Sequence, residues 1–305
     1  MLLAIDVGNS NTVLGLYPAH GAATNAGGKG AEAPVEGEPA SAAVETSTQR
    51  YGLELTAHWR ITTPEARTSD EFGMLLRSLF DLGGVKMTDV TGIVISSVVP
   101  PLDSILRHVC EHFFKIRPVF IEPGVKTGLP VLTDNPAEVG ADRIVNCVAA
   151  YERFKSACII VDMGTATTFD VVSPKGEFLG GAIAPGLGIS AEALFTRAAR
   201  LPRCDVKKPA KVIGTGTVDN IQIGLYYGYI GLVDGILERM IERMLTDHGA
   251  DTKIYTIATG GLAKLIAAGS RFIGIVDENL TLTGLRVVYE RHMERQDKHH
   301  RRRTV

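Results

Sequence analysis

The chain of 305 residues lacks the features that mark secreted, membrane-spanning and disulfide-bonded proteins. Its four cysteines, Cys110, Cys147, Cys158 and Cys204, show no C-x-x-C spacing and predict buried reduced thiols, not a disulfide framework or a zinc site. No apolar run approaches the roughly 18–20 residues of a membrane span. No basic segment followed by a long apolar region marks a signal peptide. We therefore expect a cytoplasmic protein with no membrane partner.

Signals for nucleic acid and for several enzyme classes are also missing. The net charge of −2 gives no global attraction to polyanions. The single Trp59 and the scattered aromatic residues offer no stacking surface for single-stranded nucleic acid. The eight histidines do not cluster with acids or cysteines at metal-ligand spacing, and no G-x-S-x-G or Walker A pattern occurs. We expect no nucleic-acid partner, no serine-hydrolase elbow and no P-loop.

The sequence does contain one motif that occurs twice, D-x-G-x-x-x-T, at residues 6–12 and at residues 162–168. Each copy lies between two short apolar runs, which predicts a strand, a turn and a second strand. The Gly after each Asp permits a tight turn that brings backbone amides close to an anion. An Asx-turn would explain one copy. The repeat instead favours two related half-domains that close on a metal–nucleotide.

The apolar pattern predicts an α/β fold with mixed sheets flanked by helices, in two halves of the same order. We place an N-terminal domain at residues 1–135, a C-terminal domain at residues 136–290 and a flexible basic tail at residues 291–305. Residues 18–50 hold almost no large apolar side chain. This composition predicts a disordered or loosely ordered insertion at a hairpin tip.

The predicted helices cover residues 69–81, 100–114, 136–155, 186–200, 216–248, 261–268 and 280–293. The predicted strands cover residues 2–6, 12–17, 53–61, 92–97, 118–121, 157–162, 167–172, 178–184, 254–258 and 272–276. Four glycines, Gly224, Gly228, Gly231 and Gly235, interrupt the longest helix. They predict either close helix packing or a kink.

A second constellation, Gly140-Ala141-Asp142-Arg143, falls inside the predicted helix at residues 136–155. A Gly lowers helix propensity, and its presence is explained if a ligand approaches the backbone. Asp142 offers a proton acceptor beside Arg143, which offers a clamp for a carboxylate. A helix surface with adjacent opposite charges would carry the same residues and contribute little to stability. Local chemistry leaves both interpretations open.

Two strand–helix junctions, at residues 184–188 and 258–263, contain glycines and could receive an anion or a nucleotide's base or ribose. Ordinary turns would explain them equally well. Neither junction identifies a ligand by itself.

Three segments taken together resemble one family. They are residues 6–12, the G-A-D-R-I-V-N run at residues 140–146, and residues 162–168 with the G-G-A-I-A-P-G run at residues 180–186. They resemble the type III pantothenate kinases, members of the acetate and sugar kinase/Hsp70/actin superfamily. The likeness covers nearly the whole chain outside the insertion and the tail. It implies duplicated actin-like (ribonuclease H-like) domains with a cleft between them.

The resemblance implies ATP-dependent phosphorylation of pantothenate at its 4′-hydroxyl, the first step of coenzyme A synthesis. Asp142 would then be the general base, and Gly140 and Arg143 would hold pantothenate. Another small-molecule kinase of the superfamily and a non-catalytic regulatory relative remain the alternatives.

The resemblance also implies the nucleotide and cation sites. Asp6 would lie at the phosphate–Mg²⁺ site, and Asp162 would help bind an essential monovalent cation, K⁺ or NH₄⁺. The residues expected to cradle ATP are Asp6, Gly8, Asn9, Ser10, Asn11, Thr12, Gly164, Thr165 and Thr168.

Two further positions concern pantothenate. Thr196 matches a Thr that reaches the substrate from the other subunit of a homodimer, which would put the substrate site near the subunit interface. Thr133 stands where many family members carry Tyr, so a contact to pantothenate would be lost or replaced there.

Overall fold

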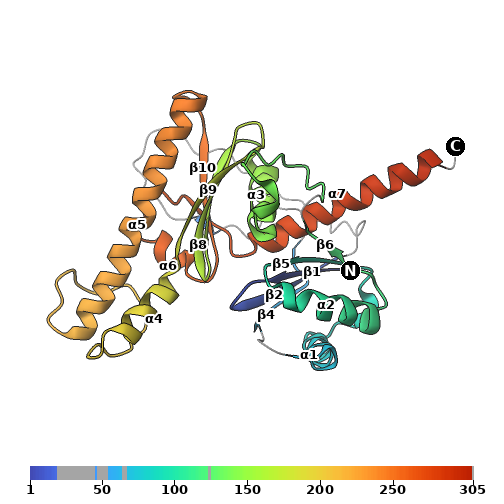
Figure 1. Ribbon diagram of the computed structural model, residues 1–305, viewed down its shortest axis with the longest axis horizontal. Coiled ribbons are helices and arrows are strands. Elements are labelled where there is room, and N and C mark those ends of the chain that lie inside the picture. Colours follow the sequence, from blue (N-terminus) through green and yellow to red (C-terminus); the bar gives the residue numbers. More distant parts are fainter. Residues whose placement is uncertain (19–44, 47–53, 64–66, 123–124, 304–305) are drawn as a thin grey trace.

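The computed structural model describes residues 1–18, 45–46, 54–63, 67–122 and 125–303. These residues form two mixed sheets flanked by helices (Figure 1), as the sequence predicts. Most of the predicted insertion at residues 18–50 lies outside the described residues. The exceptions are Pro18 and a short strand, β3 (Glu45–Thr46).

The first sheet has the strand order β4-β2-β1-β5-β6. Its centre is β1 (Leu2–Val7), which pairs antiparallel with β2 (Asn11–Tyr17) and parallel with β5 (Gly92–Ser97). The two edges are β4 (Ala57–Thr62), antiparallel to β2, and β6 (Val119–Phe120), parallel to β5.

The second sheet repeats this plan with the order β9-β8-β7-β10-β11 and adds β3 beyond β11. Its centre is β7 (Ala157–Met163), antiparallel to β8 (Ala166–Val172) and parallel to β10 (Ile254–Thr259). The flanking strands are β9 (Phe178–Pro185) and β11 (Ile275–Val276). Strand order and strand direction therefore agree between the two halves, which confirms the duplicated architecture.

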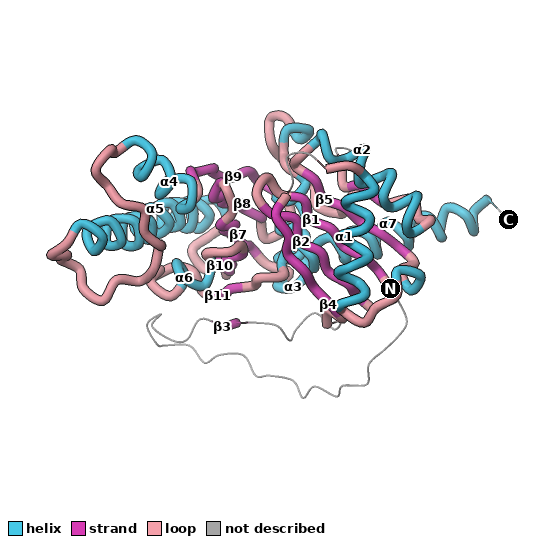
Figure 2. The backbone as a smooth tube through the Cα atoms, turned by 90° about the horizontal axis from the view of Figure 1, so that it is seen from below, coloured by secondary structure: helices cyan, strands magenta, loops and turns pink. Residues whose placement is uncertain are grey.

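Helices form three layers around the sheets (Figures 1 and 2). The first sheet is covered on its outer face by α1 and α2, the second by α4, α5 and α6, and α3 and α7 pack into a core that both sheets share. The helices are α1 (Ser69–Leu82), α2 (Pro100–Val109), α3 (Ala141–Phe154), α4 (Leu187–Arg197), α5 (Thr217–His248), α6 (Ala263–Ala267) and α7 (Leu280–Arg303). Shorter turns of helix are η1 (Met87–Asp89), η2 (Cys110–Phe114) and η3 (Pro136–Glu138).

Local chemistry explains where these elements begin. In α1 a capping box joins Thr68 and Glu71, each side chain bonding the other residue's backbone N–H. The apolar residues of α1 recur at helical spacing, so Phe72, Leu76 and Phe80 are all buried against the first sheet. The helix therefore forms where its cap and its apolar stripe agree.

Two predicted helices differ clearly in the structure, and the longest one forms as predicted. The helix predicted at residues 136–155 begins at Ala141, because Asn135 caps the separate turn η3 and Gly140 is extended. The last helix continues to Arg303, where the sequence predicts a flexible tail; its polar residues are mostly good helix formers. Helix α5 remains one helix through its four glycines.

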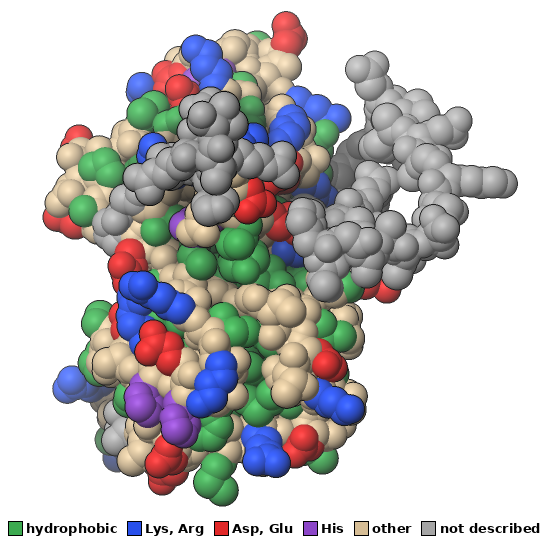
Figure 3. Space-filling view, turned by 90° about the vertical axis from the view of Figure 1, so that its right-hand side faces the viewer, with side chains coloured by type: hydrophobic (Ala, Val, Ile, Leu, Met, Phe, Trp, Pro, Cys, Tyr) green, Lys and Arg blue, Asp and Glu red, His purple; other side chains and the backbone are tan. Residues whose placement is uncertain are grey.

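Side chains of both charge signs are interspersed over the face in Figure 3. Within the described part of the chain, no helix combines the length and the apolarity needed to cross a bilayer.

Candidate active site

Two strand–turn–strand units, one from each sheet, meet at their turns. The first hairpin consists of β1 and β2 with residues 8–10, and the second hairpin of β7 and β8 with residues 164–165. Their turns touch directly, because the hydroxyl oxygens of Ser10 and Thr165 lie 2.8 Å apart. The fold thus brings the two copies of the D-x-G-x-x-x-T motif together.

A cleft of about 480 Å³ opens at this contact, lined by both hairpins, by the start of α3 and by the junction of β10 with α6. It contains most of the residues expected to bind nucleotide and cations. These are Asp6, Gly8, Asn9, Ser10, Asn11, Asp162, Gly164, Thr165 and Thr168, together with the predicted base Asp142.

Three carboxylates share the cleft, and burial is the main cause that raises the pKa of each. Burial raises the pKa of Asp6 to about 8, with Asp142 and Asp162 adding to the rise and the side chains of Ser96 and Arg60 opposing it. Burial, then the charge of Asp142, raises the pKa of Asp162 to about 7. Ionising several buried acids so close together is costly unless a positive charge lies beside them, so the cluster suits a site that receives cations.

Asp142 lies in the first turn of α3, where one carboxylate oxygen accepts a hydrogen bond of 2.8 Å from the backbone N–H of Arg143. Burial raises its pKa, and this hydrogen bond opposes the rise. A methyl group on Gly140 would lie 2.5 Å from the Asp142 Oδ1 atom. A side chain at residue 140 would therefore collide with this carboxylate, and the role of Gly140 toward a ligand stays a prediction.

Arg143 is held by an acid that the sequence motifs do not include. Its Nε donates to Oδ1 of Asp170 at 2.7 Å, and its Nη2 lies 2.6 Å from the same oxygen. The Asp170 side chain has no solvent exposure and the Arg143 side chain only 16%. Asp170 lies two residues after Thr168 on β8, so strand alternation places both on one face. The two-residue spacing from Thr168 is the sequence signal that could have identified Asp170.

The remaining predicted substrate residues are not in the cleft. Thr133 lies near Gly180 of β9, where a methyl group on the glycine would approach the Thr133 methyl to 3.8 Å. Arg143 approaches the adjacent Gly181, so these groups gather beside the cleft. Thr196, on α4, is exposed and bonds Glu192 of its own helix.

The two hairpins differ by one residue in their turns. Asp6 pairs with Val13 across the first hairpin, whereas Asp162 pairs with Thr168 across the second. The last Thr of the motif therefore points to opposite faces of the hairpin in the two copies. Thr168 lines the cleft, but Thr12 is 1% exposed, bonds Thr63 and does not line it. The prediction that Thr12 belongs to the phosphate cradle is not matched by its side chain.

Asn146 is a further neighbour of the site that the sequence interpretation left without a role. Its side-chain nitrogen donates to Oδ2 of Asp162 at 3.0 Å. Its amide oxygen is buried and has no hydrogen-bond partner among the described residues. Asn146 lies four residues after Asp142 in α3, a spacing that places both on one helix face.

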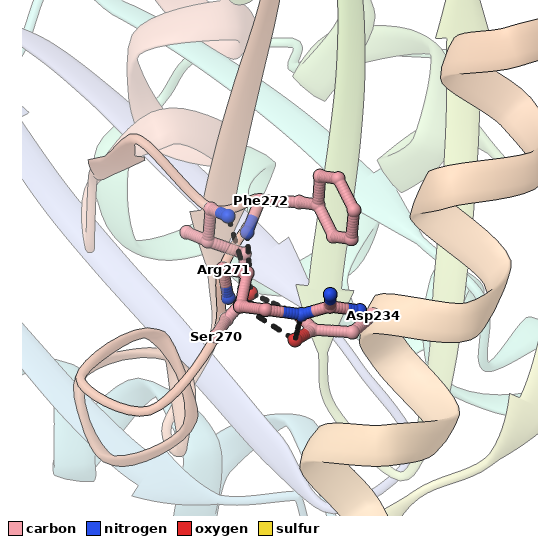
Figure 4. A network of polar contacts seen from close by, with 5 residues as sticks. Asp234, Ser270, Arg271 and Phe272 are labelled. Carbon is pink, nitrogen blue, oxygen red and sulfur yellow. Dashed lines mark hydrogen bonds and ion pairs between the residues drawn. The ribbon is translucent and has the colours of Figure 1, made fainter. Parts of the chain in front are cut away.

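The junction of β10 and α6 closes the cleft from the second sheet. Gly260 has a φ of +94°, and a methyl group there would lie 2.7 Å from the carbonyl oxygen of Met163, so only glycine fits. Behind α6, Asp234 of α5 accepts from the Ser270 hydroxyl at 2.5 Å and from the Arg271 backbone (Figure 4). This network holds the loop that follows the junction.

The metal-binding capacity of the site rests on single carboxylates. No group of three His, Cys, Asp or Glu side chains within the described residues could hold a metal ion by itself. A separate, larger depression of about 690 Å³ is lined by Ile121, Glu122, residues from Val125 to Val139 and the start of α3, and Arg295 borders it. Its lining is mostly apolar and includes none of the three clustered aspartates. The chemistry therefore points to the smaller cleft.

Comparisons with known proteins agree on one family. The family model described as type III pantothenate kinase matches residues 2–239. A protein named type III pantothenate kinase from Koribacter versatilis is 56% identical over 291 residues, covering 95% of this chain and 96% of that protein. One of the same name from Acidobacterium capsulatum is 53% identical over 290 residues, covering 95% and 94%.

A solved structure of a Baf family protein from Campylobacter jejuni has a similar fold. The TM-score is 0.52 at 17% identity, and the match covers 96% of this chain and 99% of that one. At this level of identity the likeness concerns the fold alone.

Proposed function

The chain belongs to the type III pantothenate kinase family, and we propose from this premise that it transfers the γ-phosphoryl group of ATP to the 4′-hydroxyl of pantothenate. The reaction is the first step of coenzyme A synthesis. A cytoplasmic location accords with this role. Phosphoryl transfer depends mainly on positioning and on charge neutralisation, and the cleft provides groups for both.

The phosphate chain of ATP binds between the two hairpins. The turn amides and hydroxyls of both hairpins face one cleft, and Ser10 and Thr165 are already in contact there. Asp6 fits Mg²⁺, because this ion retains several waters and takes one or two carboxylates together with substrate phosphates. The ion would supply positive charge to the phosphate oxygens.

Asp142 accepts the proton of the pantothenate hydroxyl as the new P–O bond forms. The carboxylate borders the nucleotide cleft and is held by the Arg143 backbone N–H. Its raised pKa brings a carboxylate closer to the working pH, which favours general-base catalysis.

The carboxylate of pantothenate is held by Arg143. Asp170 fixes the guanidinium by binding Nε and Nη2, which leaves the Nη1 edge for a substrate. The immobilised fork supports an orienting role, since a pre-positioned guanidinium loses little entropy on binding. Gly140 leaves room beside Asp142, and Thr133 takes part in the same substrate pocket.

Asp162 and Asn146 fit a monovalent cation. The amide oxygen of Asn146 is buried without a partner among the described residues, directly beside the Asp162 carboxylate. Oxygen atoms of this kind are the donors that a hard cation prefers. K⁺ or NH₄⁺ bound there would add positive charge at the base of the second hairpin.

The active form is a homodimer in which the substrate site lies near the subunit interface. Four glycines recur along α5 at helical spacing. Among the described residues, methyl groups on Gly224, Gly228 and Gly231 would touch nothing within 4 Å, and one on Gly235 only Arg239. Exposed apolar side chains also occur on α5 and on α4, which contacts it, at Tyr227 and Leu194. A second copy packed there would cover them and bring its Thr196 toward the neighbouring site.

The observation that carries the proposal is the meeting of two acidic hairpins at Asp142. The test is a coupled assay of ADP release with ATP and pantothenate, with mass measurement of the product. Sugars and acetate in place of pantothenate separate this kinase from other small-molecule kinases. ADP release that requires pantothenate supports the proposal. Faster turnover of a sugar or acetate would replace the substrate, and no turnover at all would favour the regulatory alternative.

A further inference from the structure

Arg60 lies on β4, an edge strand of the first sheet, outside both hairpins. Side chains alternate along this strand. Trp59 and Ile61 pack against the core of the first sheet, whereas Arg60 is exposed on the opposite face. That face borders the cleft, and Arg60 is part of its lining.

The side chain of Arg60 extends toward the second sheet. A methyl group placed on Gly261, at the junction of β10 and α6, would lie 3.5 Å from Nη1 of Arg60. Gly261 lines the same cleft. A ligand that lies against Gly261 therefore has the Arg60 guanidinium within reach.

Arg60 supplies a charge that the rest of the cleft lacks. Among the described residues lining the cleft it is the only Lys or Arg, whereas the acids there are Asp6, Asp142, Asp162 and Glu278. Glu278 already pairs with Lys264. The charge of Arg60 opposes the pKa rise of both Asp6 and Asp162, so its field reaches both hairpins.

The donors of Arg60 are not committed to the protein. No ion pair or hydrogen bond joins its guanidinium to another residue in the described part of the chain. Arg143, in contrast, uses two of its nitrogens on Asp170. An unpaired guanidinium fits phosphate oxygens with two parallel N–H donors.

We propose that Arg60 binds the phosphate chain of the nucleotide, donating to its non-bridging oxygens from the side of the first sheet, opposite Gly261. This inference rests on the proposed function for the identity of the ligand as ATP. Arg60 then neutralises phosphate charge that three neighbouring carboxylates would otherwise repel. It also joins β4 to the second sheet through the ligand.

The test compares Arg60→Ala and Arg60→Lys with Arg77→Ala, which removes an exposed Arg of α1 far from the cleft lining. Dissociation constants for ATP and for adenosine are measured by competition with a fluorescent nucleotide, and thermal melting checks the fold. For Arg60→Ala we expect ATP to bind ~10–100-fold more weakly, the usual loss for a hydrogen bond to a charged group. We expect adenosine binding to be unchanged, Arg60→Lys to be intermediate and Arg77→Ala to match the wild type.

An unchanged ATP affinity in Arg60→Ala would overturn the inference. So would an equal loss for ATP and adenosine in a variant that melts like the wild type, since the contact would then not be with phosphate. The proposed function fails separately. A wild-type protein that binds ATP through Arg60 but does not phosphorylate pantothenate would leave the Arg60 contact standing and remove pantothenate as the substrate.

Discussion

The two hairpins share a sequence motif, but their acids, Asp6 and Asp162, have different surroundings. Asp6 is opposite Ser96 in the parallel ladder, and the Ser96 side chain opposes the rise of its pKa. Asp162 is instead bonded to Asn146 of α3. The pKa of Asp6 rises to about 8 and that of Asp162 to about 7, and the charge of Arg60 opposes both rises. The two acids therefore have different polar neighbours, which supports the proposal that they hold different cations.

The turn lengths show how this divergence arises. One extra residue in the first turn rotates Thr12 into the core, while Thr168 stays in the cleft and bonds Asp170. A single residue therefore decides whether a hydroxyl supports the fold or faces the ligand. The comparison predicts that the two hairpins contribute unequally to catalysis, with Asp142 acting between them.

The largest effect should come from Asp142→Asn, because neither hairpin can replace a base. We expect kcat to fall by ~10²–10⁴-fold, the usual contribution of a positioned general base, with ATP affinity nearly unchanged. Steady-state kinetics and nucleotide titration measure the two quantities. Asp134→Asn makes the same change at an exposed nearby position and should be neutral. Normal turnover in Asp142→Asn would remove the base assignment.

Asp6→Asn should be the more damaging of the two hairpin substitutions. Loss of the carboxylate at the Mg²⁺ position should lower kcat by ~10²–10³-fold, a loss comparable to that of one preorganised electrostatic contact. The requirement for Mg²⁺ should also shift to higher concentration. If Asp6→Asn and Asp162→Asn had the same effect on kcat and on the Mg²⁺ titration, the distinction between the hairpins would be wrong.

Asp162→Asn should have a smaller effect that depends on the salt. In the wild type, replacing K⁺ by Na⁺ should depress activity. Asp162→Asn should lower activity in K⁺ by ~10-fold, about the value of one charge-assisted contact, and should remove the difference between the two salts. Rates measured in matched KCl and NaCl buffers test this. Equal wild-type rates in both salts would count against the cation site.

The smallest effect concerns stability without ligands. Burial raises the pKa of Asp6 to about 8 and that of Asp162 to about 7, from the ordinary value of 3.8. The folded state therefore binds more protons than the unfolded state between pH ~4 and these values, so stability should fall as pH rises through that range.

Replacing either acid by Asn should flatten this dependence. At pH 8 we expect Asp6→Asn to be more stable than the wild type, because the neutral amide does not carry the cost of ionising a buried acid near Asp142 and Asp162. Near pH 4 the difference should be much smaller. Denaturant unfolding at a series of pH values measures the slopes, and parallel slopes for wild type and variant would contradict the pKa assignment.

Much of this site was predictable from sequence because its motifs lie at turns. The Gly two residues after each Asp marks a tight turn, and the repeat of the motif indicates that the two turns are equivalent, which predicts corresponding positions for Asp6 and Asp162. The residues around Asp142 do not distinguish a site from an ordinary helix surface. The start of α3 at Ala141, after an extended Gly140, is what brings Asp142 to the cleft.

The residues that the sequence motifs do not identify are recognised only from their tertiary neighbours. Asp170 bonds Arg143 and Asn146 bonds Asp162, from which they are 27 and 16 residues away in sequence. Arg60 lies on an edge strand and approaches Gly261 at the junction of the other sheet. Thr12 is buried because of a turn length that the motif D-x-G-x-x-x-T does not encode. Long-range contacts and, at Thr12, the pairing register decide these outcomes.

Whether both hairpins hold one phosphate chain can be seen in a crystal structure with a non-hydrolysable ATP analogue and Mg²⁺. We expect the phosphate oxygens to lie between the turns that carry Ser10 and Thr165, with the γ-phosphate facing Asp142. A triphosphate bound elsewhere, for example in the depression beside residues 125–139, would show that the hairpins do not form the phosphate site.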